Sequence, residues 1–186
     1  MAGRSQAKRK RVAKEDHRDG DLATVSIPGF FTAETELEFR DFLALIFAAT
    51  SAFQAGRRQI ARQFGLSATE LAVFLAASKL NGMPSVGQIA QHLRVSATNV
   101  TTDANRLVKA GLLEKFPNPA DARAVQIGIT KAGDGVLRQV TPILREANNR
   151  LFAGLSRSDV TRLRAVLEQM IRASNSFSSE LRERAD

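Results

Sequence analysis

Two helix start signals only eleven residues apart constrain this chain most strongly. Ser85 is followed three residues later by Gln88, which is the spacing of a capping box, and Ser96 is followed by Asn99 at the same distance. Apolar residues recur at helical intervals after each signal, at Val86, Ile89, Ala90 and Leu93 and then at Val100, Ala104, Leu107 and Val108. We therefore predict two amphipathic helices joined by a short turn, the second ending near Gly111.

The second of these helices has an outer face of small hydrogen-bonding side chains. Thr98, Thr101, Thr102, Asn105 and Lys109 recur there at spacings of three and four. Short Thr and Asn side chains let a helix lie deep in a DNA major groove, where they can bond base edges and nearby phosphates. An ordinary solvated face is the alternative, but such faces are usually rich in Glu and Lys. The residues that we predict to contact DNA are Ser96, Thr98, Asn99, Thr101, Thr102, Asn105 and Arg106.

A hairpin is predicted directly after this helix. Val125, Ile127 and Ile129 alternate with smaller or polar residues, as in a half-buried strand, and a loop that includes Pro117 to Arg123 precedes them. The guanidinium of Arg123 can enter a minor groove, and Asp121 can hold it in place through a charged hydrogen bond. A surface ion pair of little consequence is the alternative interpretation.

The run Asp121-Ala-Arg-Ala-Val-Gln-Ile-Gly-Ile-Thr130, together with the order of the elements before it, resembles the MarR family of bacterial transcription regulators. The wing signature of that family is Asp-x-Arg followed by an apolar-x-Leu-Thr ending, and Ile129 replaces its leucine. The resemblance extends over the second helix through Gly111, Leu112 and Leu113. It implies a mainly α fold with a small β-hairpin wing, a homodimer with winged helix-turn-helix lobes, and a transcription regulator that often responds to small phenolic or carboxylate ligands.

The charge of the chain fits a polyanionic partner. The 186 residues carry a net charge of +8, and the pI is about 10.7. Residues 1–18 alone supply +5 of this charge and have few apolar residues, so we expect residues 1–29 to be a basic, disordered extension. Such a tail either adds phosphate contacts that do not depend on sequence or only increases solubility.

No segment of the chain is expected to enter a membrane. The longest apolar-rich stretch without charges, residues 42–56, is shorter than the roughly 20 residues that span a bilayer. Acidic residues and not an apolar core follow the basic cluster, which argues against a signal peptide. The absence of cysteine excludes disulfides and thiol-based sensing. We expect a soluble, cytoplasmic protein.

Two long helices are predicted to form a homodimer. Thr32 can cap the first, which carries a broad apolar surface at Phe39, Phe42, Leu43, Ile46, Phe47 and Phe53. Ser156 and Asp159 form a capping box for the last, whose apolar stripe is Val160, Leu163, Leu167, Met170, Phe177 and Leu181. Packing within one chain competes with packing across a two-fold axis. We favour the dimer, because two reading heads meet two half-sites and approximately double the binding free energy.

These predictions divide the chain into functional regions. Residues 30–186 form one unit of the MarR type, in which 30–64 and 131–186 are dimerisation helices and 65–130 are the DNA-binding lobe. A capping box at Ser67 and Glu70 opens the first helix of the lobe, which ends near Asn81 and Gly82. Because family effectors bind between the dimer helices and the lobe, a small aromatic or carboxylate ligand would meet Phe53, Arg57, Arg58 and Phe64. Arginines at a helix C-terminus are also favourable without any ligand.

Two other classes of function compete with a DNA-binding regulator. The chain has only two histidines, His17 and His92, and no glycine-rich phosphate loop, so we expect no catalytic residue, no cofactor and no metal. A winged helix that binds an acidic protein partner, or DNA nonspecifically, remains the alternative. Asp103 favours this alternative, because a carboxylate on a DNA-reading helix is costly near phosphates unless it accepts a hydrogen bond from a cytosine or pairs with Arg106. The preferred function is a sequence-specific regulator, a repressor, that binds double-stranded DNA.

Overall fold

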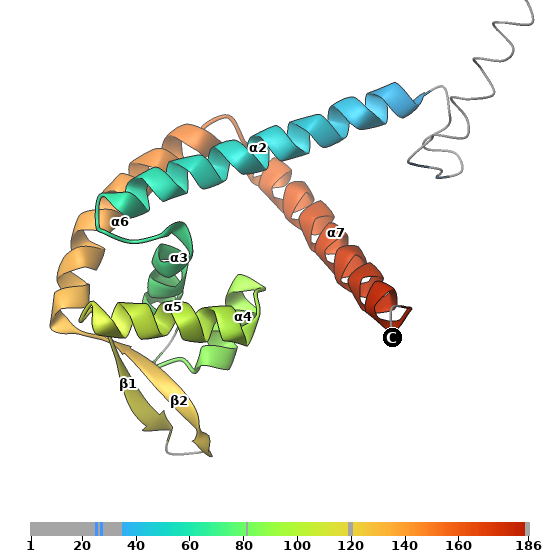
Figure 1. The fold of residues 1–186 in the computed structure, drawn as a ribbon. Helices are drawn as coiled ribbons and strands as arrows, with labels where there is room; N and C mark the ends of the chain where they lie inside the picture. The colour runs from blue at the N-terminus through green and yellow to red at the C-terminus, as the bar shows by residue number, and fades with distance from the viewer. Residues whose placement is uncertain (1–24, 26, 28–34, 81, 119–120, 185–186) are drawn as a thin grey trace, which may run out of the picture. The chain divides into compact units, whose positions relative to one another are not determined.

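The computed structural model describes residues 25, 27, 35–80, 82–118 and 121–184, without the side chains of residues 121–124. The chain forms two compact units, Met1–Ala68 and Thr69–Asp186 (Figure 1). Apart from residues 25 and 27, the basic extension lies outside the described residues, as does Thr32. The predicted division into dimerisation helices and a DNA-binding lobe stays a prediction.

The first unit contains a single long helix in its described part, α2 (Glu36–Arg62). This helix ends in a turn in which Gly65 has φ of +69° and the Leu66 amide donates to the Ala61 carbonyl oxygen at 3.0 Å. The α2 surface is strongly apolar: Phe47 is 72% exposed, Phe42 and Phe53 are also exposed, and other members of the predicted stripe are half-buried.

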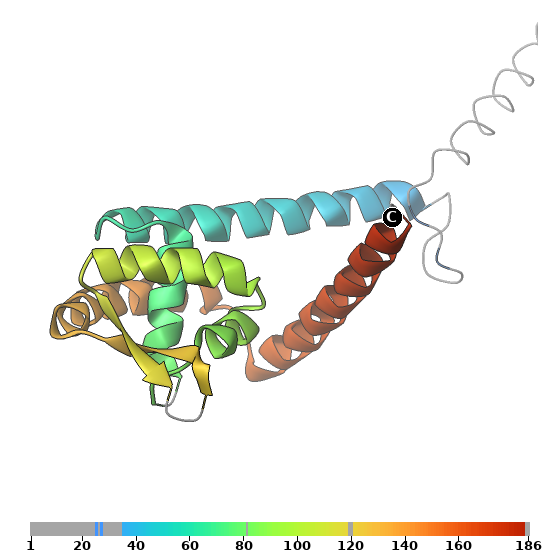
Figure 2. The ribbon, with the colours of Figure 1, turned by 60° about the horizontal axis from the view of Figure 1, so that its bottom comes forward.

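The described residues of the second unit form, in chain order, α3 (Ala68–Lys79), α4 (Val86–Leu93), α5 (Ala97–Lys109), β1 (Leu113–Asn118), β2 (Asp121–Ile129), α6 (Lys131–Phe152) and α7 (Arg157–Glu183). Figures 1 and 2 show the hairpin beside the group formed by α3, α4 and α5. The predicted fold class, mainly α with a small β hairpin, is therefore confirmed.

Side-chain caps determine where α4 and α5 begin. The Ser85 hydroxyl accepts from the backbone N–H of Gln88 at 3.2 Å, and the side-chain oxygen of Gln88 accepts from the backbone N–H of Ser85 at 2.8 Å. This is the predicted capping box of α4. The Ser96 hydroxyl caps α5 by accepting from the Asn99 amide at 3.2 Å. α5 then ends just before Gly111, which has φ of +72°, as predicted.

The hairpin is antiparallel, with Leu113 opposite Ile129 and Lys115 opposite Ile127. Its register is irregular between Pro117 and Asn118, close to the tip. The segment before α4 also joins β2, because the Ile127 amide donates to the Pro84 carbonyl oxygen at 2.9 Å. The segment before α4 therefore holds β2 in the half of the hairpin nearest its base.

The core of the second unit draws on every element from α3 to α6. Its largest fully buried apolar side chains are Phe74, Leu71, Ile89, Leu107, Leu113, Ile127, Val100 and Val140. Burial of such side chains is the main driving force for folding. α7 differs, because none of its 27 residues is buried.

Helices α6 and α7 begin with hydroxyl caps, at Thr130 and at Ser156. Ser156 and Asp159 make the predicted capping box, and hydrogen bonds from Ser156 hold the pKa of Asp159 below its ordinary value. α6 contains Pro142, which lacks an amide donor, and the helix bends along its length in Figure 1.

Gly133, in the first turn of α6, lies where backbone segments approach closely. A Cβ at this position would overlap the carbonyl oxygen of Leu112 and lie 3.0 Å from the Ile129 side chain. Gly135 is two residues away in the same helix, and a Cβ there would meet nothing within 4 Å. The two glycines therefore offer a matched pair of substitutions.

Gly133→Ala is expected to lower the free energy of unfolding by about 1 to 3 kcal/mol, because backbone must shift to admit the methyl group. Gly135→Ala is expected to raise it by up to about 1 kcal/mol, through the better helix propensity of alanine. Urea denaturation followed by circular dichroism measures both values. Equal effects of the two changes would show that the close contact between residue 133 and the Leu112 backbone does not exclude a methyl group.

Candidate nucleic-acid interface

The outer face of α5 is exposed and its inner face is buried, as the sequence predicts. The buried apolar residues are Val100, Ala104 and Leu107, whose side chains are inaccessible to solvent, and Asp103 is also buried. The residues predicted to contact DNA are all exposed, namely Ser96, Thr98, Asn99, Thr101, Thr102, Asn105 and Arg106. Exposure makes these side chains available to a partner, and their contacts with DNA stay a prediction.

Two threonines on this face are hydrogen-bonded within their own helix. The Thr101 hydroxyl donates to the Ala97 carbonyl oxygen at 2.9 Å, and the Thr102 hydroxyl donates to the Thr98 carbonyl oxygen at 3.1 Å. Each oxygen keeps lone pairs that can accept, and each side chain presents a methyl group. These threonines are therefore arranged as acceptors and apolar contacts, whereas donation to a phosphate requires a rotation.

Asn105 is linked to the hairpin. The ammonium group of Lys115, on β1, donates to the Asn105 side-chain oxygen. Because an ammonium group only donates, this contact sets which end of the amide faces the lysine and leaves the NH₂ group for other acceptors. Sequence reasoning missed Lys115, since no periodicity relates a residue of a helix to one of the following strand.

Arg106 is paired with two carboxylates that are largely shielded from water. Its guanidinium lies 3.9 Å from an Asp103 oxygen and 3.7 Å from a Glu70 oxygen of α3, and those side chains are only 11% and 13% exposed. Asp103 is thus paired with Arg106, and this pairing lowers the cost of a carboxylate on a helix that would approach phosphates. The Arg106 side chain is itself 62% exposed and can still meet a phosphate.

Thr130 connects α5, the hairpin and α6. Its hydroxyl donates to the Gly111 carbonyl oxygen at 2.6 Å and accepts from the Gly133 amide at 2.9 Å. Its own amide donates to the Leu112 carbonyl oxygen at 3.2 Å. One residue therefore joins the end of α5, the base of the hairpin and the start of α6.

Other predicted site residues lie elsewhere. The backbone of Asp121 and Arg123 belongs to β2, but their side chains are outside the described part of the structure. Arg57 lies over the ring of Phe53 at 5.3 Å from its centroid, and both belong to α2. Arg58 is exposed and Phe64 is half-buried.

Two candidate features are absent from the described residues. None of their helices is long and apolar enough to cross a membrane. In the same residues, no group of three or more His, Asp or Glu side chains is placed to hold a metal ion.

The two capped helices, the short turn and the hairpin define a winged helix-turn-helix. A sequence model of the MarR family matches residues 64–124. The transcriptional activatory protein BadR of Rhodopseudomonas palustris is 30% identical over 156 residues, which cover 80% of this chain and 88% of BadR. The chain belongs to the MarR family of transcription regulators. Its predicted lack of enzymatic activity agrees with that membership.

Other relatives match over shorter spans or in fold alone. The transcriptional repressor IacR of Pseudomonas putida is 32% identical over 88 residues, which are 47% of this chain and 53% of IacR. The crystal structure of the S. aureus MepR–DNA complex has a TM-score of 0.60 at 19% identity, covering 71% of this chain and 96% of MepR. BpsR of Bordetella bronchiseptica has a TM-score of 0.58 at 22% identity, covering 70% of this chain and 98% of BpsR.

Arg106→Met is expected to lower the free energy of unfolding by about 1 kcal/mol, because Asp103 and Glu70 would lose their shared cation. Lys109→Met is the control, since it removes a charge from the exposed face of the same helix and should change stability by less than about 0.5 kcal/mol. Chemical denaturation of both variants measures the difference. If Arg106→Met is as stable as the control, the ion pairs contribute nothing to folding.

Proposed function

We propose that this chain is a homodimeric, sequence-specific DNA-binding regulator that reads a palindromic operator. The observation that carries the proposal is the exposed face of α5, where short polar side chains project from a helix whose opposite face is fully buried. A helix of this kind can enter a major groove without long side chains holding it away from the base edges.

The chemistry of this face indicates how it would read bases. The methyl groups of Thr101 and Thr102 suit contact with thymine methyls, and their oxygens can accept from the amino groups of adenine or cytosine. The NH₂ group of Asn105 can donate to acceptors such as guanine O6 or purine N7. Lys109, Lys115 and Arg106 add positive charge for the adjacent phosphates.

The exposed apolar surfaces support a dimer. α7 has no buried residue, yet Val160, Leu163, Leu167, Phe177 and Leu181 are each 45% exposed or more. Soluble proteins rarely leave such a surface uncovered. We propose that α2 and α7 pack against a second copy about a two-fold axis, which would place two recognition helices at half-sites about 34 Å apart.

Three further features are proposed with this function. The basic extension 1–29 would add phosphate contacts, and partnership with the chromosome would place the protein in the cytoplasm. A small aromatic or carboxylate ligand would bind near Phe53, Arg57, Arg58 and Phe64, where Arg57 already lies over the ring of Phe53. We predict that this chain represses transcription, and whether a regulator represses or activates depends on where its operator lies. The relatives include a repressor, IacR, and an activatory protein, BadR.

Selection of bound duplexes from a random DNA pool, at near-physiological salt, tests the proposal. We expect enrichment of a palindrome with half-sites one helical turn apart. Asn105→Ala should change the base preferred at one position of each half-site and leave the other positions unaltered. Binding without enrichment that vanishes as salt rises would favour the alternative function, a basic winged helix that meets an acidic protein or DNA nonspecifically.

Arg123→Ala is expected to weaken binding to the selected duplex by about 1 to 3 kcal/mol, because it would remove a specific groove contact of the wing. A fluorescence titration at one fixed salt concentration measures this change. Arg150→Ala is the control, since Arg150 is exposed on α6 and is paired with Glu146. Unchanged affinity in Arg123→Ala would remove the wing from the mechanism.

A further inference from the structure

Arg94 occupies an unfavourable backbone position in the turn between α4 and α5. It caps the C-terminus of α4 with φ of 57° and ψ of 43°, and it is the only non-glycine residue with positive φ in the described part of the chain. This left-handed region suits glycine or asparagine, because a Cβ crowds the backbone there. An arginine at this position suggests that its side chain has a role.

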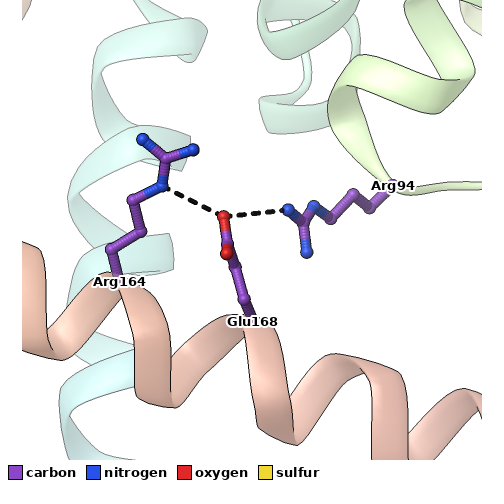
Figure 3. A network of polar contacts seen from close by, with 3 residues as sticks. All are labelled: Arg94, Arg164 and Glu168. Carbon is purple, nitrogen blue, oxygen red and sulfur yellow. Dashed lines mark hydrogen bonds and ion pairs between the residues drawn. The ribbon is translucent and has the colours of Figure 1, made fainter.

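The Arg94 side chain reaches across to α7. Its guanidinium lies 3.5 Å from a carboxylate oxygen of Glu168, although the two residues are 74 positions apart in the chain. The same oxygen accepts from Arg164, one turn earlier on α7, at 3.0 Å (Figure 3). Glu168 thus connects its own helix to the turn that precedes the recognition helix.

The charges around Glu168 favour its ionised form. The hydrogen bond and the charge of Arg164, followed by the charges of Arg94 and Arg172, hold the pKa of Glu168 below its ordinary value, while partial burial opposes this shift. The carboxylate is therefore ionised at neutral pH, and its attraction for Arg94 would be lost only as the pH falls through that lowered pKa.

Little else joins α7 to the helix-turn-helix. Among the described residues, this is the only ion pair between them. An open apolar groove of about 560 Å³ lies beside it, lined by Phe152 and Leu163 among others and bordered by Arg94, Arg164 and Glu168. The described residues leave this groove open, so the pair of Arg94 and Glu168 is the specific polar contact that relates the turn to α7.

We propose that Glu168 is a positioning residue for DNA reading, which holds Arg94 and thereby sets the position of the recognition helix relative to α7. The inference rests on the proposed function and deepens it. If α7 lies in the dimer interface, the ion pair fixes the position of each recognition helix, α5, relative to that interface. A helix that must meet a half-site at a fixed spacing binds less tightly when its position is less restricted.

A direct role of Arg94 in binding phosphate makes the opposite prediction for one variant. If Arg94 served as a phosphate contact, Glu168 would compete with DNA for it, and Glu168→Gln would tighten binding. If Glu168 positions the turn, the same change weakens binding. Arg94→Met weakens binding in both cases. Methionine also has a Cβ, so the energetic cost of the left-handed backbone at this position is unchanged.

The experiment compares Glu168→Gln, Arg94→Met, their double variant and Arg162→Met with the full-length wild-type chain. The affinity for the selected duplex is one readout. The other, without DNA, is hydrogen exchange at the Val95 amide, which donates to the Ala90 carbonyl oxygen at 3.1 Å within the turn. Arg162→Met is the matched control, because Arg162 is an exposed arginine of the same helix and, among the described residues, forms no ion pair with Glu168 or with the turn.

We expect Glu168→Gln and Arg94→Met each to weaken DNA binding about three- to tenfold and to speed exchange at Val95. The double variant should bind DNA no more weakly than the single variant with the lower affinity, and Arg162→Met should match the wild type. Tighter binding by Glu168→Gln, additive losses or unchanged exchange at Val95 would overturn the inference. If the wild type selects no duplex, the proposed function fails, and the exchange rates still decide whether the ion pair holds the turn.

Discussion

The hydrogen bonds of Thr130 are the contact on which the winged helix depends. Its hydroxyl donates to the Gly111 carbonyl oxygen at the end of α5 and accepts from the Gly133 amide at the start of α6. Gly111 ends α5 through its left-handed conformation, and Gly133 lets α6 begin against the Leu112 backbone. Helix, hairpin and α6 therefore meet at one point, so the wing keeps a defined place beside the recognition helix.

The outer face of α5 is ordered before any partner arrives. Thr101 and Thr102 are hydrogen-bonded to their own helix, Lys115 orients the Asn105 amide, and Arg106 neutralises Asp103 and Glu70. Side chains that are already held lose less conformational freedom on binding. The same contacts keep the carboxylate of Asp103 paired, which limits its repulsion of phosphates.

Much of the second unit could be predicted from local patterns. The Ser85, Ser96 and Ser156 caps, the buried stripe of α5, the β2 strand and the stop near Gly111 all appear in the structure. The predicted alternation in β2 holds only in part, because Ile127 is buried but Val125 is exposed and Gly128 is buried beside Ile127. Each depends on residues a few positions apart, where backbone geometry determines which side chains can meet. The contacts of Asn105 with Lys115 and of Arg106 with Glu70 escaped prediction, because these partners come from β1 and α3 and helical periodicity does not specify them.

The sequence by itself determined the elements and the family, because capping, periodicity and the wing signature are local properties of the chain. It also determined that α2 and α7 carry apolar surfaces. Only the tertiary structure decided which polar groups meet across elements, such as Thr130 with Gly111 and Arg94 with Glu168. Those pairings depend on how separate helices and strands pack in space, and a contact between residues 74 positions apart leaves no periodic trace in the sequence.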